Sequence, residues 1–403
     1  MDHQQTSNSS PGSPSSTSWS TGEQESIDQD SSSSLLPVAA VCNNLDLYIN
    51  SLRTSRFVGA ILEEVDQLED GSFVVASSCI DSKYNAGYVT RFPSLEAIPA
   101  SATDCLYINP GFGPISSMVT TSERSTLKST SSAPPLIFGG FDSGAVVAFS
   151  QSQLEIVETK RLFHNVVSRI RLSAGAASPR LLAADLSGRL VVLDVETFDP
   201  LKVFDYAHDG PVYDAVWPSL AHHRSAGDSL FLSAGGDNEI LAWDLRTTTP
   251  ATLVPPAKAV LCCSSAPTAL LWPTEAEMLF GTEAGNLVRF DLRSKRALAV
   301  QAAFNDRPIR KIVPVKCLGG GGRDIIAVIA DDSPEVLYYD RKNLEPGAVP
   351  LSRQSYGFDV RSVVEIVSGG GGDQDGLQTS SSRLVTIGTG GGISVQHSSD
   401  IIR

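Results

Sequence analysis

The chain lacks the features of a secreted or membrane-spanning protein. Its N-terminus has no basic segment followed by an apolar core, so we expect no signal peptide. No apolar run approaches the length that crosses a bilayer. The six cysteines show no C-x-x-C spacing and no His at zinc-site distance, which favours reduced thiols over a metal site. We therefore expect a protein of the cytoplasm and nucleus, without a membrane partner, bound metal or cofactor.

Positive charge is also scarce. The chain has 31 Lys and Arg against 45 Asp and Glu, a formal net charge of −14, and no Lys or Arg precedes Arg53. An acidic surface repels phosphate groups, so direct binding of nucleic acid is not expected, whereas basic protein segments suit it as partners. Residues 1–34 are Ser-rich with few large apolar groups, which predicts a disordered acidic tail.

The most informative stretch is residues 207–246. Three short apolar runs are separated there by turn residues, which predicts consecutive antiparallel strands. The Gly-Gly-Asp-Asn sequence at 235–238 supplies the residues that a tight hairpin needs. This pattern is typical of one WD repeat, which forms one blade of a β-propeller.

Four residues of this stretch predict a buried hydrogen-bonded chain, because a buried Trp or His needs polar partners. We expect Trp243 to donate to Ser233, Ser233 to His208, and His208 to Asp237. A Ser/His/Asp set can also form a hydrolase triad. However, Trp243 has no role in a triad, and no G-x-S-x-G sequence surrounds Ser233. The set is therefore predicted to be structural, and no catalytic residue is expected.

The third strand of this pattern recurs along the chain. Equivalent residues are spaced by 57, 44, 50, 47, 49 and 57 positions, and most intervals exceed the ~40–45 of a typical WD repeat. These residues are Phe92, Phe149, Leu193, Trp243, Phe290, Tyr339 and Gln396. Seven copies predict an all-β, seven-bladed WD-repeat β-propeller, in which only the fourth copy carries the complete set of four polar residues.

The last copy is too short to form a complete blade. Only seven residues follow Gln396, too few for a turn and a fourth strand. An incomplete blade would expose an unpaired strand edge. We therefore expect a strand from about residues 35–52 to complete the last blade, so that the propeller domain spans residues 35–403.

Loop lengths distinguish the two faces of the predicted propeller. Five polar insertions follow first strands, which places them on one face, and they lie at 121–135, 173–179, 219–228, 319–323 and 368–382. On the opposite, compact face, one second-to-third-strand connection is long, at residues 78–86. A long loop among short ones is often functional, and divergence of the first repeat is the alternative explanation.

With the copies aligned, the chain resembles the methylosome WD-repeat subunit family (methylosome protein 50) over most of residues 57–397. The segments that carry the resemblance are 75–78 with 86–87, 141–146, 231–246 with 250–252, and 281–288. The resemblance implies a non-catalytic scaffold in a hetero-oligomer with a type II protein arginine methyltransferase. It also implies that the scaffold binds the N-terminal barrel of the enzyme and helps present the basic tails of histones and Sm proteins.

The resemblance places the partner contact in the long loop of the first copy, at Lys83, Tyr84 and Asn85. The family has an aromatic residue where this chain has Asn85, and Tyr84 lies one position earlier. Tyr84 is therefore the expected aromatic contact.

Two other classes of function are alternatives to a scaffold. A substrate receptor of a cullin-type ubiquitin ligase has a Trp-Asp-x-Arg motif, which Trp243, Asp244 and Arg246 match, although the motif is frequent in ordinary WD repeats. An enzyme is not supported, because the histidine pair at 222–223 has no third ligand in reach and the glycine run at 319–322 lacks the Lys of a phosphate loop.

Overall fold

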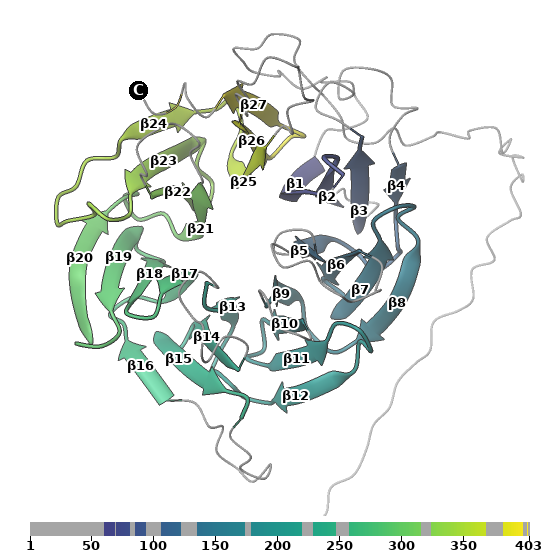
Figure 1. The fold of residues 1–403 in the computed structure, drawn as a ribbon, viewed down its shortest axis with the longest axis horizontal. Helices are drawn as coiled ribbons and strands as arrows, with labels where there is room; N and C mark the ends of the chain where they lie inside the picture. Colours follow the sequence, from purple (N-terminus) through teal and green to yellow (C-terminus); the bar gives the residue numbers. More distant parts are fainter. Residues whose placement is uncertain are drawn as a thin grey trace, which may run out of the picture. The chain divides into compact units, whose positions relative to one another are not determined.

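The computed structural model describes residues 60–68, 70–80, 85–93, 106–121, 135–173, 179–219, 229–246, 258–315, 324–367, 382–397 and 401. The chain divides into two compact units, Met1–Leu35 and Leu36–Arg403, and every described residue lies in the second. Strands of that unit form seven sheets, which radiate as blades from a central axis (Figure 1). The predicted tail and the predicted closing strand at 35–52 lie outside the described residues.

Each sheet is antiparallel, and its strands follow chain order from the axis outwards. Blade 1 contains β1 (Ala60–Gln67), β2 (Phe73–Ile80), β3 (Asn85–Phe92) and β4 (Leu106–Ile108). Blade 2 contains β5 (Ile115–Thr120), β6 (Leu136–Phe141), β7 (Ala145–Ser150) and β8 (Ile156–Arg161). Blade 3 contains β9 (Val167–Leu172), β10 (Arg180–Asp185), β11 (Leu190–Asp194) and β12 (Pro200–Phe204). Blade 4 contains β13 (Val212–Val216), β14 (Leu230–Gly235), β15 (Glu239–Asp244) and β16 (Lys258–Cys262).

The remaining blades follow the same plan. Blade 5 contains β17 (Pro267–Thr274), β18 (Glu277–Thr282), β19 (Asn286–Asp291) and β20 (Arg296–Ala302). Blade 6 contains β21 (Ile309–Val315), β22 (Ile325–Ala330), β23 (Glu335–Asp340) and β24 (Ser352–Ser355). Blade 7 has three strands among the described residues, namely β25 (Val360–Val367), β26 (Ser382–Gly388) and β27 (Ile393–His397).

Burial falls from the middle of each blade to its outer edge. The second strand β22 has the sequence IIAVIA and is buried along its whole length, because neighbouring blades cover both of its faces. The outermost strand β8, with the sequence IVETKR, is half-buried at best. This gradient explains why middle strands have continuous apolar runs, whereas outer strands are mixed in polarity.

The hydrophobic core lies between the blades. Seven clusters of buried side chains each join one blade to the next, and one of them joins blade 7 to blade 1. In that last cluster Phe73 and Leu62 of blade 1 meet Val385 and Ile366 of blade 7. A fully buried side chain of this size contributes about 1.5–3 kcal/mol. Packing between blades therefore closes the ring.

The prediction of an all-β, seven-bladed propeller is confirmed. The seven predicted third strands are β3, β7, β11, β15, β19, β23 and β27. The five polar insertions fall between the first and second strands of their blades, although their own residues are mostly outside the described part. No helix in the described ranges is long and apolar enough to cross a membrane.

Candidate functional site

The four polar residues of blade 4 form one hydrogen-bonded chain. Trp243 Nε1 donates to Ser233 Oγ over 2.8 Å, and Ser233 Oγ lies 2.6 Å from His208 Nε2. His208 Nδ1 lies 2.9 Å from a carboxylate oxygen of Asp237. Ser233 and Trp243 are fully buried, so this serine has no access to a substrate. These hydrogen bonds connect four parts of the protein: the second strand of blade 4, its third strand, the turn between them, and the link from blade 3.

The protonation of His208 fixes the direction of these hydrogen bonds. Burial lowers the pKa of His208, although the Asp237 carboxylate acts in the opposite direction. A neutral imidazole donates from Nδ1 to Asp237 and accepts the Ser233 proton at Nε2. Asp237 also accepts from the backbone N–H groups of Asp209 and Glu239, at 3.0 and 3.1 Å.

Replacing His208 with alanine is expected to lower the free energy of unfolding by about 1–3 kcal/mol, because Ser233 and Asp237 lose a buried partner. Urea denaturation of wild type and variant measures the difference. His164→Ala is the control, since His164 is exposed. Equal stability of the two variants would contradict a role for the His208 hydrogen bonds.

The residues of the two predicted partner contacts lie in different surroundings. Lys83 and Tyr84 lie outside the described residues. Asn85 begins β3, is exposed, and pairs with Ile80 next to the β2–β3 connection. In the Trp-Asp-x-Arg motif, Trp243 is buried and contributes no surface. Arg246 folds back onto Asp244 with a 2.8 Å ion pair, and 59% of its side chain is exposed.

A second feature, which lines the central channel, includes none of the site residues predicted from the sequence. The first strand of every blade carries a β-bulge at the equivalent position, seen as a shift in its pairing with the second strand. We call the extra residues the bulge ring: Glu63, Ser116, Ser168, Tyr213, Thr268, Arg310 and Arg361. A bulge redirects side chains, and the charged residues that follow the bulges meet across the channel.

The residues that follow the bulges form what we call the floor ring: Glu64, Ser117, Arg169, Asp214, Ala269, Lys311 and Ser362. Their charged members are joined across the channel. Glu64 pairs with Lys311 and lies 3.6 Å from Arg169, whose Nε lies 3.1 Å from Asp214. Lys311 also donates to Ser362 over 2.8 Å. The floor ring therefore links blades 1, 3, 4, 6 and 7 in one polar network.

Electrostatics favour the ionised form of Glu64 within this network. Burial alone would raise the pKa of its carboxyl group. The charges of Lys311, Arg169 and Arg171 outweigh that effect and hold the pKa below its ordinary value. A buried carboxylate that is compensated in this way depends on its cations for stability.

Above the floor ring lies a cavity of about 380 Å³. Six members of the bulge ring line it, with Arg169 below them and rim residues such as Asp142, Glu283 and Asp331 around them. A sequence pattern could have indicated this site. In six first strands two polar residues follow one another directly, as in Glu63-Glu64 and Arg310-Lys311, and such a pair breaks the alternation of polar and apolar residues in a regular strand.

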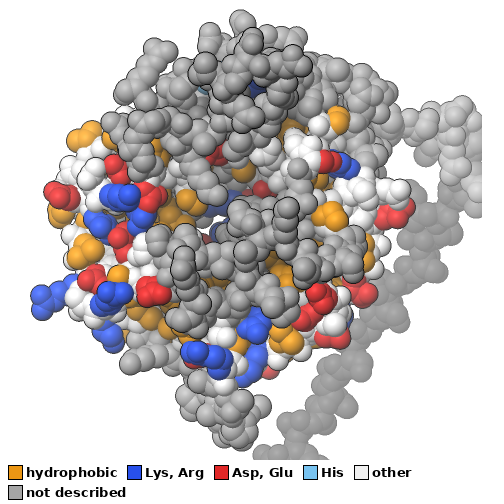
Figure 2. All heavy atoms as spheres, viewed as in Figure 1, with side chains coloured by type: hydrophobic (Ala, Val, Ile, Leu, Met, Phe, Trp, Pro, Cys, Tyr) orange, Lys and Arg blue, Asp and Glu red, His pale blue; other side chains and the backbone are white. Residues whose placement is uncertain are grey.

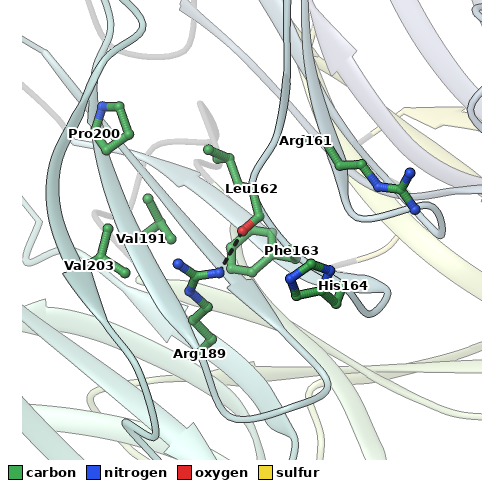
Figure 3. Close-up of a pocket in the computed structure, with 8 residues that line it drawn as sticks. All are labelled: Arg161, Leu162, Phe163, His164, Arg189, Val191, Pro200 and Val203. Carbon is green, nitrogen blue, oxygen red and sulfur yellow. Dashed lines mark hydrogen bonds between the residues drawn. The ribbon is translucent and has the colours of Figure 1, made fainter.

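A smaller cavity of about 300 Å³ lies at the outer edge, between blades 2 and 3 (Figure 3). Arg189 reaches across it and donates to the Leu162 carbonyl over 2.9 Å, while its Nε pairs with Asp205 at 2.8 Å. Val191 and Val203 form an apolar wall. Because its central cation is already paired, this cavity joins two blades rather than offering a charged site.

The seven four-stranded or three-stranded sheets define the class of this protein among the described residues: a seven-bladed β-propeller, a fold that commonly serves as a scaffold for protein interactions. Comparison with protein-family models gives no match, and a search of curated proteins finds no similar sequence. Among the described residues, no group of three or more His, Cys, Asp or Glu side chains could hold a metal ion.

Proposed function

We propose that this protein is a non-catalytic scaffold subunit of a protein arginine methyltransferase complex, the methylosome. In this proposal it binds a type II methyltransferase and helps present basic, Arg-rich tails such as those of histones and Sm proteins. It acts in the cytoplasm and nucleus, without a cofactor, as part of a hetero-oligomer.

The observation that carries the proposal is where the family-like segments fall on the propeller. Residues 141–146 span the turn between β6 and β7, and residues 281–288 span the equivalent turn between β18 and β19. Residues 231–246 cover β14 and β15, which hold Ser233 and Trp243. The resemblance is thus concentrated in second strands, third strands and the turns of the compact face. The formal charge of −14 also favours basic partners.

Affinity purification of the tagged full chain from cells, followed by mass spectrometry, tests this proposal. A co-purified type II arginine methyltransferase supports it. A co-purified cullin adaptor, lost on Arg246→Ala, would instead support the ubiquitin-ligase alternative, because the Arg246 guanidinium is the exposed part of the Trp-Asp-x-Arg motif. Absence of the methyltransferase would refute the scaffold role.

Tyr84→Ala is expected to weaken methyltransferase binding by about 2 kcal/mol or more, because an aromatic anchor at an interface contributes on this scale. Surface plasmon resonance measures the affinity, and thermal melting checks that the propeller is intact. Deleting residues 369–372 is the control, since this segment is part of the connection from β25 to β26, which is expected on the opposite face from the β2–β3 connection. If the deletion abolishes binding and Tyr84→Ala does not, the partner binds the insertion face.

A further inference from the structure

The cavity at the channel mouth has an excess of negative charge. Its lining holds four carboxylates and two guanidinium groups, a formal charge of 2 − 4 = −2. These groups are Glu63, Asp142, Glu283, Asp331, Arg169 and Arg310. Around the rim of the face shown in Figure 2, Lys and Arg side chains lie beside Asp and Glu.

The positive groups of the cavity are already occupied. Arg310 lies 2.7 Å from Glu63 and 3.1 Å from Asp331, and Arg169 is held by Asp214 in the floor ring. Asp142 and Glu283 form no ion pair within the described part of the chain. Burial without a compensating cation raises the pKa of Asp142. Two carboxylates at the rim therefore remain available to a positively charged ligand.

The bulge-ring residues between these two carboxylates are uncharged and rich in oxygen, and the one cation on this side, Arg169, is paired with Asp214. Blades 2 to 5 contribute Ser116, Ser168, Tyr213 and Thr268 to the bulge ring. The Ser168 hydroxyl is buried and makes no hydrogen bond to the described residues. The Thr268 hydroxyl donates to the Ile309 carbonyl over 2.7 Å, which leaves its oxygen free to accept. Tyr213 adds an aromatic ring.

We propose that this cavity binds the guanidinium group of an arginine side chain carried by a basic protein tail. A guanidinium has five N–H donors spread over a plane, which suits several separate acceptors better than a compact ammonium group does. An aromatic ring such as that of Tyr213 in the lining also attracts a cation. This inference rests on the proposed function, because that function supplies Arg-rich tails as partners.

Fluorescence anisotropy with a labelled peptide of alternating Gly and Arg residues tests the cavity directly. We expect the wild-type chain to bind this peptide and not the same peptide with citrulline, which is neutral and similar in shape. The double variant Asp142→Asn/Glu283→Gln should raise Kd about tenfold or more, because it removes both unpaired carboxylates of the cavity. The control is Glu155→Gln/Glu345→Gln, which removes the same charge from exposed positions outside the cavity.

Three results would overturn the proposal: no binding of the Arg peptide to the wild-type chain, equal binding of the citrulline peptide, or an unchanged Kd in the cavity double variant. Thermal melting of each variant verifies folding. Methyltransferase co-purification with the same variants separates this inference from the proposed function. Loss of the enzyme from the wild-type purification would refute the scaffold role, while the peptide titration still decides whether the cavity binds arginine.

Discussion

Lys311→Met should lower the free energy of unfolding by about 3–5 kcal/mol, because it leaves the Glu64 carboxylate buried in the channel without its nearest cation. The Glu64 side chain is 7% exposed and that of Lys311 is 15% exposed, so water replaces little of the lost interaction. Urea is the suitable denaturant, since guanidinium would screen the charges under study. The double variant Glu64→Gln/Lys311→Met should recover part of the loss, because it removes the buried carboxylate together with its nearest cation.

Lys160→Met is the matched control for this prediction. Lys160 pairs with Asp199 over 2.6 Å, but 70% of the Asp199 side chain is exposed, and such a pair contributes about 0–1 kcal/mol. Equal losses from Lys311→Met and Lys160→Met would show that the floor ring network adds nothing to stability.

The pH dependence gives a second measurement. The neighbouring cations hold the pKa of Glu64 below its ordinary value of 4.5. Its stabilisation is therefore fully present above pH 4.5 and is lost as the pH falls through the lower folded-state pKa. Protonation of Glu64 removes the charge that Lys311 stabilises in the wild type, so the wild-type advantage over Lys311→Met should shrink on acidification. An advantage that stays constant down to pH 3 would contradict this account.

The fold and the blade 4 hydrogen bonds were predictable because their signals are local. Ser233 and Trp243 lie on adjacent strands joined by a tight turn, 10 positions apart, and His208 precedes Ser233 by only 25 positions. Side chains this close along the chain can be assigned to one blade from the order of strands and turns alone. The Gly-rich turns that precede most third strands set the register of the repeat in the same way.

The channel site was not predicted because its signals are distant and depend on pairing register. Glu64 and Lys311 are 247 positions apart, and no spacing rule connects them before the ring is closed. Whether two adjacent polar residues both face the channel depends on a bulge. A bulge is defined only once the second strand is in place, as the pairing of Leu62 with Ser77 and of Glu64 with Ala76 shows. The cavity is thus a product of the assembled ring.

Glycines in three of the compact-face turns connect local and long-range structure. Gly144, Gly188 and Gly285 have φ values of +79°, +91° and +78°. Each lies against the segment that leads into the next blade, and a Cβ at any of them would overlap a backbone carbonyl oxygen there. Around Gly285 the contact is reinforced, because its carbonyl accepts from the N–H groups of Ala303 and Phe304 at 3.1 and 3.0 Å.

Gly285→Ala is therefore expected to lower the free energy of unfolding by about 3 kcal/mol or more, since it adds a steric overlap with the Phe304 carbonyl to the strain of a positive φ. Gly347→Ala is the control, because Gly347 has a φ of +81° but a Cβ added there would meet nothing within 4 Å, so only the backbone strain of about 1 kcal/mol applies. Urea denaturation of both variants separates the two contributions. The difference between the two losses in free energy of unfolding measures how tightly the turn of blade 5 packs against the link to blade 6. Equal losses would show that this link moves to accommodate the added methyl group without destabilising the protein.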